Sequence, residues 1–385
     1  MTQSDKSDKI VTMKITENKK EKRLASEKYN YIFRKTDGYF WRWGETEDDD
    51  PRWSPFGPEL LDLEISTGKC NGRCKFCYKN NGEDVNTHHM TLEEFKIIFH
   101  KVSKNKVLGQ IAFGICDISS NPDFFAMMEY SKDHGVVPNY TCNGLEVTKK
   151  IAKKTAKLCG AVAVSLVNKE KTYDAIKKFS IDNNMNQCNI HYMLSLETYD
   201  RAFDIIDDIA SDPRLKNFNA IVFLQYKPKG KNPDAFHSVL SVEKYTKLIN
   251  YCDEKEVSYG FDSCSANIFI ESIPSTVRKF EIGKDAPDEA KRYFEDIRNR
   301  RIRELETMAE PCESGMFSSY INCYGKFFVC SFAEGEDQWQ EGLDVLNCNN
   351  FLKDIWFHPR LSKWRSRLIK NERNCPIYEL SLECV

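Results

Sequence analysis

The sequence predicts an α/β protein built on a partial (β/α)6 barrel, with an N-terminal β-hairpin before it and a small α+β domain after it. Three observations support this fold class. Six short apolar or β-branched runs alternate with amphipathic helical stretches, two aromatic-rich runs precede them, and the alternation stops before a cysteine-rich C-terminal part. Strands that alternate with helices form right-handed βαβ units on a parallel sheet, and six such units curl into an open barrel.

The N-terminal part divides into two segments. Residues 1–28 are polar and lysine-rich without apolar periodicity, which predicts a disordered tail. Residues 29–60 contain two aromatic-rich runs around Asp37 and Gly38, a pair typical of a tight turn, and then a Pro- and Gly-rich stretch. We therefore expect a hairpin followed by a linker. No apolar core of signal-peptide length is present, so the sequence predicts a cytoplasmic protein.

Residues 61–256 carry the barrel repeats. The predicted strands are 61–66, 110–115, 136–141, 161–166, 189–194 and 220–226, and the predicted helices are 91–102, 122–134, 148–158, 172–183, 198–210 and 242–254. Thr91 and Glu94 have the spacing of a capping box. Asn121 followed by Pro122 is typical of an N-cap and a first helical residue.

Residues 257–385 are predicted to form the C-terminal domain. A strand-like run at 257–263 is followed by a charged helix over 287–309 and by an aromatic-rich tail with six cysteines. The basic run at 291–303 also contains acidic residues at helical spacing, which indicates a solvated helix face. A formal net charge of -2 argues against a nucleic-acid binder, and no apolar run reaches the length of a membrane span. The sequence thus predicts neither a nucleic-acid nor a membrane partner.

Fifteen cysteines are the compositional anomaly. In a reducing cytosol, clustered cysteines indicate metal binding or chemistry more often than disulfides. Cys70, Cys74 and Cys77 follow the first predicted strand, and three thiolates within eight residues can supply three of the four iron ligands of an iron-sulfur cube. A zinc site, which needs four ligands, is the alternative, with His88 and His89 nearby.

The CxxxCxxC spacing, aromatic Phe76 before the third cysteine and the position in the first loop of a βα barrel resemble the radical S-adenosylmethionine superfamily. The resemblance covers residues 61–230. It implies that these cysteines hold a 4Fe-4S cluster with an open iron site to which S-adenosylmethionine binds. It also implies reductive cleavage of this cofactor to a 5'-deoxyadenosyl radical, which removes a hydrogen atom from a substrate, and a reductant such as flavodoxin or ferredoxin.

The same resemblance assigns further cofactor-binding residues. Ile115, Cys116 and Asp117 take the place of a Gly-Gly-Glu run, with Asp117 keeping a carboxylate for the cofactor's ammonium group; an aspartate that caps a turn is the alternative. Asn143 lies in a turn similar to the family's TNG turn, Ser165 closes the fourth strand, and Tyr226 opens a YxPxG-like ending that would bracket adenine. Cys116 is also a candidate hydrogen-atom donor, with burial as a small apolar side chain as the alternative.

The C-terminal cysteines resemble the opening of a SPASM or twitch extension, which carries auxiliary 4Fe-4S clusters. The full SPASM pattern needs a CxxC-rich second half that this sequence lacks, so we expect one auxiliary cluster. The predicted ligands are Cys264, Cys312, Cys330 and Cys375, with Cys348 as an alternative for one place. A structural zinc in this domain is the other interpretation.

The resemblance makes a peptide or peptidyl side chain the expected substrate, with crosslinking, epimerisation or maturation as the outcome. Two alternatives stay open: a radical enzyme that acts on a small metabolite, and a zinc-stabilised binding module without catalysis. The short N-terminal segment leaves little room for a separate peptide-recognition domain.

Overall fold

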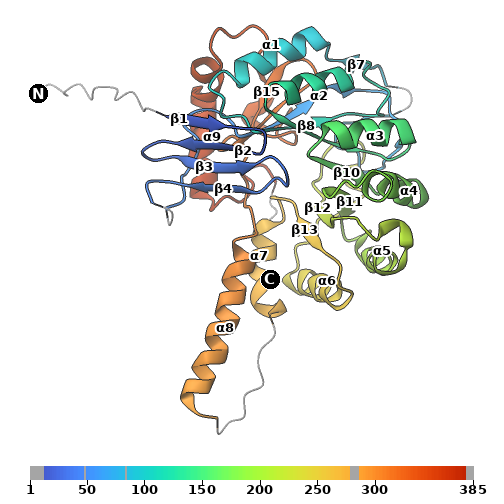
Figure 1. Cartoon of the computed structure of the whole chain (residues 1–385), viewed down its shortest axis with the longest axis vertical. Helices are drawn as coiled ribbons and strands as arrows, with labels where there is room; N and C mark the ends of the chain where they lie inside the picture. The colour runs from blue at the N-terminus through green and yellow to red at the C-terminus, as the bar shows by residue number, and fades with distance from the viewer. Residues whose placement is uncertain (1–12, 47–48, 83–84, 278–285, 379–385) are drawn as a thin grey trace, which may run out of the picture.

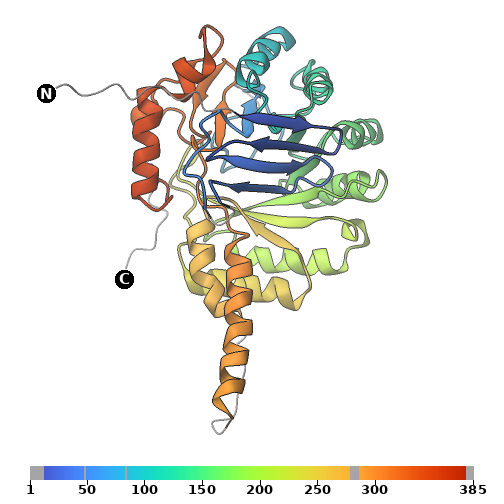
Figure 2. The same cartoon turned by 60° about the vertical axis from the view of Figure 1, so that its left-hand side comes forward.

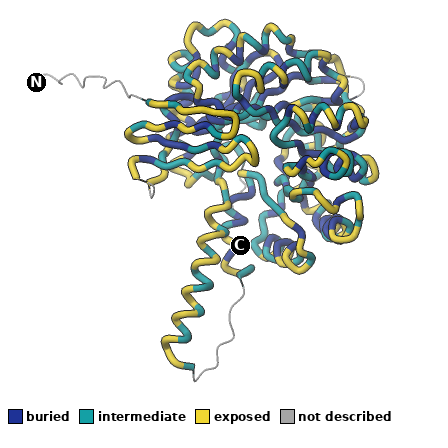
Figure 3. The backbone as a smooth tube through the Cα atoms, viewed as in Figure 1, coloured by how far each residue is buried: buried dark blue, intermediate teal, exposed yellow. Residues whose placement is uncertain are grey.

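The computed structural model describes residues 13–46, 49–82, 85–277 and 286–378. Its centre is a ten-stranded sheet in the order β13-β12-β11-β10-β9-β8-β5-β14-β15-β16, and a four-stranded antiparallel sheet lies on one flank (Figures 1 and 2). Buried residues lie in the strands of the central sheet and also in the helices and the N-terminal sheet that pack around it (Figure 3).

The barrel is formed by parallel strands, each followed by a helix or loop that returns to the next strand. The strands are β5 (Leu60–Glu64), β8 (Gln110–Gly114), β9 (Val137–Cys142), β10 (Ala161–Ser165), β11 (Cys188–Leu194), β12 (Ala220–Gln225) and β13 (Tyr259–Phe261). The six predicted strands and the parallel sheet are confirmed. β13 falls in the seventh strand-like run and pairs in parallel with β12, so it extends the barrel sheet.

Six helices cover the outside of the barrel: α1 (Leu92–Val102), α2 (Phe124–Asp133), α3 (Lys149–Leu158), α4 (Lys169–Ser180), α5 (Tyr199–Ser211) and α6 (Val242–Glu254). A short 3-10 turn, η1 (Pro213–Leu215), precedes β12. The capping box of Thr91 and Glu94 is present. The predicted N-cap at Asn121 is wrong: its amide donates to the carbonyls of Ile65 and Met90, and the helix begins after Asp123.

Strand periodicity explains how the barrel acquires an inside and an outside. Along β11 every second residue, from Cys188 to Leu194, is buried against the surrounding helices. His191 and Met193 lie between them and therefore point to the other face, where they line a cavity. The alternation that predicted the strand thus also divides packing residues from residues available for a site.

The N-terminal sheet contains β1 (Lys14–Glu17), β2 (Glu21–Ala25), β3 (Asn30–Arg34) and β4 (Phe40–Trp43). The predicted hairpin is present as β3 and β4, and Gly38 in its turn has a φ of 77°. The prediction of a disordered tail is wrong for the residues of β1 and β2. The alternation of apolar residues that marks a strand is absent from β2 because Lys22 occupies one of its buried positions. The Lys22 ammonium group donates to the carbonyl of Leu108 at 2.8 Å. Residues 1–12 lie outside the described residues.

The C-terminal part begins with α7 (Ala266–Thr276) and α8 (Asp288–Glu306), which lie side by side. α8 corresponds to the predicted charged helix; it projects from the body of the molecule and has no buried residue (Figures 1 and 2). Further elements are β14 (Ser318–Ile321), β15 (Lys326–Phe328), η2 (Asp337–Trp339), β16 (Leu343–Asp344), the π-helical turn η3 (Leu352–Trp356) and α9 (Pro359–Lys370).

β14 pairs in parallel with β5, the first barrel strand, although more than 250 residues separate them. Strands from beyond the predicted boundary at residue 256 therefore extend both edges of the barrel sheet. A small ribbon of β6 (Ser66–Thr67) and β7 (His88–His89) closes the first βα loop. Within the described residues, no helix combines the length and the apolar character needed to cross a bilayer.

Candidate functional site

A cavity of about 540 Å³ opens at the carboxyl ends of the parallel strands. This is the edge at which βα barrels and open α/β sheets bind their ligands, and the volume suits a small organic molecule. Of the residues predicted to bind the cofactor or its cluster, the cavity is lined by Cys70, Cys74, Phe76, Cys77, Cys116, Asn143, Ser165 and Tyr226. The fold thus brings residues from five strand ends to one place.

The loop from Cys70 to Cys77 turns sharply and presents three thiols to the cavity. Arg73 has a φ of 51°, and the N–H of Gly72 donates to Cys70 Sγ at 3.4 Å. A Cβ atom on Gly72 would lie 3.3 Å from Cys70 Sγ and 3.5 Å from Cys74 Sγ, so glycine keeps the space beneath both sulfurs open. Three thiols with N–H donors aimed at one of them fit an iron-sulfur cluster that takes three protein ligands.

Asp117 ties this loop to the strand ends. Its Oδ2 accepts hydrogen bonds from the backbone N–H of Asn71 at 2.9 Å and from the Asn71 side chain at 2.8 Å. Its Oδ1 accepts one from Asn143 Nδ2 at 2.6 Å, and the same amide lies 3.8 Å from Cys70 Sγ. Asp117 is buried and does not belong to the cavity lining. The structure therefore places its carboxylate behind the cysteine loop, and the predicted contact with the ammonium group of the cofactor stays a prediction.

Cys116 lies beside Cys70. Its thiol is buried and lies 3.6 Å from the carbonyl oxygen of Ser66. The hydrogen bond from Cys116 lowers the pKa of Cys70 to about 7, against the opposing effect of burial, and the N–H of Gly72 and the Asn143 amide lower it further. The pKa of Cys116 is raised by the same hydrogen bond and by burial. Burial, with the neighbouring Cys77 and Cys70, raises the pKa of Cys74 to about 12. Of Cys70, Cys74 and Cys116, Cys70 thus has the lowest pKa.

Phe76 and Tyr226 form a wall of the cavity through a shared neighbour. Phe236 lies 5.9 Å from the Phe76 ring and 5.6 Å from the Tyr226 ring, measured between centroids. The Tyr226 hydroxyl donates to the carbonyl of Pro233 at 3.0 Å. Gly230, with a φ of 91°, packs so closely on the cysteine loop that a Cβ atom would lie 2.3 Å from the Cys77 carbonyl oxygen. The loop after β12 therefore covers the cysteine loop directly.

Several polar residues of the cavity were not among the predicted site residues, including His191, Lys227 and Asp262. Lys227 is buried and forms an ion pair with Asp262. Burial opposes the charge of Lys227, but Asp262 and Cys264 raise its pKa, so the ammonium form persists. Burial lowers the pKa of His191 to about 4 and keeps the imidazole neutral. Lys227 and Asp262 are charged residues at the ends of predicted strands, and this position is the signal from which they could have been predicted as cavity residues.

A second polar network joins the cysteine loop to the C-terminal part. Lys79 Nζ lies 3.1 Å from Glu64 Oε1 and 2.9 Å from the Tyr320 hydroxyl, which donates to Glu64 Oε2 at 3.0 Å. Lys79 also pairs with Glu334. Lys79 follows Cys77 by two residues, so this network holds the end of the loop against β5 and β14.

The cysteines predicted as auxiliary ligands, with Cys348 as the alternative, lie in two separate environments. Burial raises the pKa of Cys264, Cys312 and Cys330, and these thiols act on one another: Cys312 and Cys375 each raise the pKa of Cys264 and of Cys330 further. Cys348 lies apart, with its Sγ donating to the carbonyl of Val345 at 3.3 Å. Cys375 and Cys312 thus lie close enough to Cys264 and Cys330 to influence them electrostatically, and the assignment of these four as auxiliary ligands stays a prediction. In the described ranges, no group of three or more Cys, His, Asp or Glu side chains is arranged so that it could hold a metal ion.

Replacing Asp117 tests its contacts behind the cysteine loop. If Cys70, Cys74 and Cys77 hold the predicted cluster, we expect Asp117→Ala to lower iron retention at this loop by roughly 10-fold to 100-fold, as is typical when a partner that orients a metal ligand is lost. Iron per chain after desalting, and electron paramagnetic resonance of the reduced protein, provide the measurement. Asp133→Ala, at an exposed helix end, is the matched control. Equal iron retention in both variants would contradict the role given to Asp117.

No family model and no curated protein matches this chain. Solved structures do match. Streptococcus suis SuiB bound to the precursor peptide SuiA has a TM-score of 0.63 at 13% sequence identity, over 92% of this chain and 91% of that chain. SuiB bound to S-adenosylmethionine has a TM-score of 0.59 at 13% identity, over 81% of this chain and 68% of that chain. The native enzyme anSMEcpe with bound AdoMet and Cp18Cys peptide has a TM-score of 0.54 at 15% identity, over 80% of this chain and 82% of that chain.

These matching structures are radical S-adenosylmethionine enzymes, and the identities are low enough that the likeness concerns the fold. The predicted fold class is confirmed by them and by the parallel barrel sheet. This chain has the fold of the radical S-adenosylmethionine enzymes.

Proposed function

We propose that this protein is a radical S-adenosylmethionine enzyme that abstracts a hydrogen atom from a peptide or peptidyl side chain. The observation that carries the proposal is the shared cavity: Cys70, Cys74 and Cys77 open into the same space as the carboxyl ends of the barrel strands. The bound SuiA and Cp18Cys peptides of two structural neighbours favour a peptide over a small metabolite as substrate.

In this proposal Cys70, Cys74 and Cys77 hold a 4Fe-4S cluster, which together with S-adenosylmethionine supplies a 5'-deoxyadenosyl radical when both are bound. Gly72 and Asn143 direct N–H groups at Cys70. Phe76 and Tyr226 give the cavity an aromatic wall suited to the adenine ring. The Tyr78 ring stacks on Phe332 at 4.4 Å and helps to exclude water beside the cysteine loop.

We further propose that Cys264, Cys312, Cys330 and Cys375 hold one auxiliary 4Fe-4S cluster. Their mutual effect on pKa supports this set, and the separate environment of Cys348 argues against the alternative ligand. Four cysteine ligands leave no open iron, so this cluster suits electron transfer or structural support. The enzyme needs a one-electron reductant, such as flavodoxin or ferredoxin, in the reducing cytoplasm.

Anaerobic reconstitution tests the proposal. Protein supplied with iron and sulfide, reduced with dithionite and mixed with S-adenosylmethionine is expected to show the broad visible absorbance of iron-sulfur clusters and to release methionine and 5'-deoxyadenosine. Absorbance spectroscopy and chromatography of the quenched mixture provide the measurements, with unreduced protein as the control. A protein that takes up zinc in place of iron and releases no 5'-deoxyadenosine would instead support the non-catalytic binding module.

A further inference from the structure

An unpaired carboxylate faces the interior of the strand-end cavity. Asp62 lies in the middle of β5, between the buried residues Leu61 and Leu63, and lines the cavity. Among the residues that the structure describes, its carboxyl group has no hydrogen-bond or ion-pair partner, and burial alone raises its pKa to about 6. A carboxylate withdrawn from water without a partner costs free energy, so its presence in a cavity indicates a ligand that supplies the partner.

The other carboxylates of this cavity are already paired with lysines. Glu64 Oε1 lies 3.1 Å from Lys79 Nζ, and Asp262 forms an ion pair with Lys227. Neither lysine contributes to the pKa of Asp62. The cavity thus contains both signs of charge, but of these five residues only Asp62 remains without a counter-charge. A cationic group of a ligand would complement it.

Aromatic rings flank this carboxylate. Tyr320 on β14 is the register partner of Asp62 and lines the same cavity. Burial raises the pKa of Tyr78 to about 12, and the charge of Asp62 adds to the rise, so these two side chains lie close enough to interact. A carboxylate with aromatic neighbours is suited to a cationic nitrogen, which both kinds of group attract.

Asp62 lies deeper in the barrel than the predicted cofactor contacts. Its register partner on β8 is Ala112, whose own partner on β9 is Asn139. Cys116 and Asn143 follow these two partners by four residues along the chain. Asp62 also precedes the last residue of β5 by two positions, which is about 7 Å along a strand. The carboxylate therefore faces the barrel interior below the strand ends, where a substrate group can lie beneath the cofactor.

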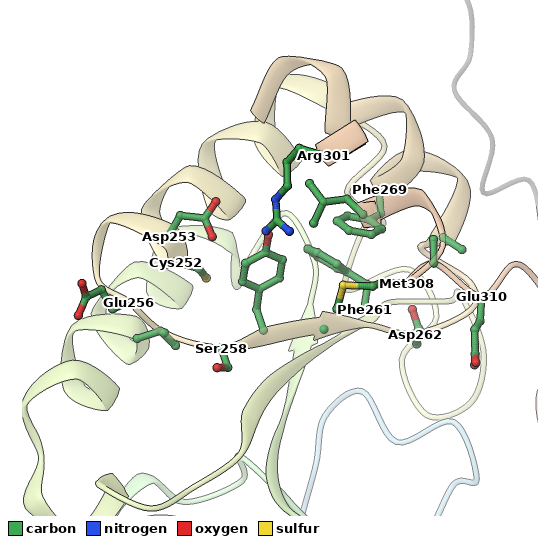
Figure 4. A pocket seen from close by; sticks show the side chains of 16 residues that line it. Cys252, Asp253, Glu256, Ser258, Phe261, Asp262, Phe269, Arg301, Met308 and Glu310 are labelled. Atoms are coloured by element: carbon green, nitrogen blue, oxygen red, sulfur yellow. The ribbon is translucent and has the colours of Figure 1, made fainter. Parts of the chain in front are cut away.

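The cavity outside β13 provides a contrast. Its volume is about 380 Å³, and Figure 4 shows Asp253, Glu310 and Arg301 among the residues that line it. Burial raises the pKa of Asp253 and of Glu310, but Arg301 opposes the rise at Asp253, and Arg42 and Arg373 oppose it at Glu310. These carboxylates already have cations nearby, unlike Asp62.

We propose that Asp62 is the counter-charge for a cationic side chain, an ammonium or a guanidinium, which the peptide substrate inserts into the barrel beneath the cofactor contacts. The proposal rests on the function proposed above and names the class of side chain that its substrate carries. Asp62 accepts hydrogen bonds from the cationic nitrogen, and the Tyr78 and Tyr320 rings lie beside it. The free protein retains the cost of an unpaired carboxylate because the substrate removes it.

The test uses reconstituted protein with S-adenosylmethionine and three blocked, dye-labelled peptides that differ only in their central residue. This residue is lysine, norleucine or glutamine; norleucine keeps the carbon chain of lysine and lacks its ammonium group. We expect fluorescence anisotropy to show at least about tenfold tighter binding of the lysine peptide than of the other two. Equal binding of the three peptides, or absence of saturable binding of the lysine peptide, would overturn the proposal.

Two charge-matched variants locate the selection. Asp62→Asn keeps the shape of the side chain and should make the three peptides bind equally. Asp253→Asn removes one carboxylate from the cavity of Figure 4 and should keep the preference for lysine. Asp62→Asn should also unfold at the same temperature as the parent or a higher one, because it removes an unpaired charge. A lower unfolding temperature would assign a structural role to Asp62, and a lysine preference that persists in Asp62→Asn would show that another group selects the substrate; either result overturns the proposal.

The cofactor is itself a cation, so its affinity is measured as well. Equilibrium dialysis should give the same dissociation constant for S-adenosylmethionine in the parent and in Asp62→Asn. Weakening by about tenfold or more would assign the carboxylate to the cofactor and overturn its assignment to the substrate.

The outcome separates this proposal from the function on which it rests. Release of 5'-deoxyadenosine without a preference for the lysine peptide would remove the role of Asp62 and keep the radical enzyme. A lysine preference that Asp62→Asn abolishes, in a protein that releases no 5'-deoxyadenosine, would keep the cation site and remove the enzyme.

Discussion

The triple variant Cys70→Ala/Cys74→Ala/Cys77→Ala is expected to release no detectable 5'-deoxyadenosine, a loss of at least about a thousandfold given the scale of enzymatic rate enhancement. The reason is direct: these thiols are the proposed ligands of the cluster that cleaves the cofactor. Iron per chain should fall from about eight to about four, because the auxiliary cluster has its own four cysteines. Iron analysis and product chromatography on proteins reconstituted side by side provide the measurements.

Single substitutions in the C-terminal part serve as controls for this iron count. Cys330→Ala should also lower the iron content to about four, this time by loss of the auxiliary cluster. Cys348→Ala should retain about eight irons and full cofactor cleavage, because Cys348 is not among the four proposed ligands and its Sγ donates to the carbonyl of Val345 instead. Iron lost from Cys348→Ala but kept in Cys375→Ala would reverse the ligand assignment. Continued cleavage by the triple variant would refute the assignment of the first cluster.

Arg42→Ala is expected to destabilise the whole fold by roughly 3 to 5 kcal/mol, the range seen when one partner of a buried ion pair is removed. Arg42 on β4 binds Glu59 through Nη2 at 2.7 Å and Nε at 2.8 Å, and Glu313 through Nη1 at 3.0 Å. It therefore joins the N-terminal sheet to the start of β5 and to the C-terminal part. Its removal leaves the buried carboxylate of Glu59 without a counter-charge. Urea unfolding followed by circular dichroism measures the change.

The penalty of Arg42→Ala should shrink at lower pH. Burial already raises the pKa of Glu59 although Arg42 opposes it, and loss of Arg42 raises it further. A carboxyl group whose pKa is higher in the folded than in the unfolded protein favours folding at low pH and costs stability as the pH rises through that interval. The difference in unfolding midpoint between variant and parent should therefore be smaller at about pH 5.5 than at about pH 7.5. Arg34→Ala, which removes an exposed pair with Asp37, is the control and should leave the midpoint unchanged.

The barrel could be predicted from the sequence because its elements have local periods. Alternate burial along β11, from Cys188 to Leu194, and the capping box at Thr91 are properties of adjacent residues. The same holds for the cysteine loop, in which three thiols and Gly72 lie within eight residues after the first strand. Such features need no knowledge of distant parts of the chain.

By itself, the sequence determined the order of the six barrel strands and their helices and the position of the three cysteines at the end of the first barrel strand. Only the tertiary structure decided that β14 pairs with β5, that Asp117 lies behind the cysteine loop, that Lys227 meets Asp262 in the cavity, and that β13 has a free edge beside α8. Strand and helix periods are set by the geometry of neighbouring residues. These contacts join residues tens to hundreds of positions apart, and packing of the whole chain, which no local pattern encodes, brings them together.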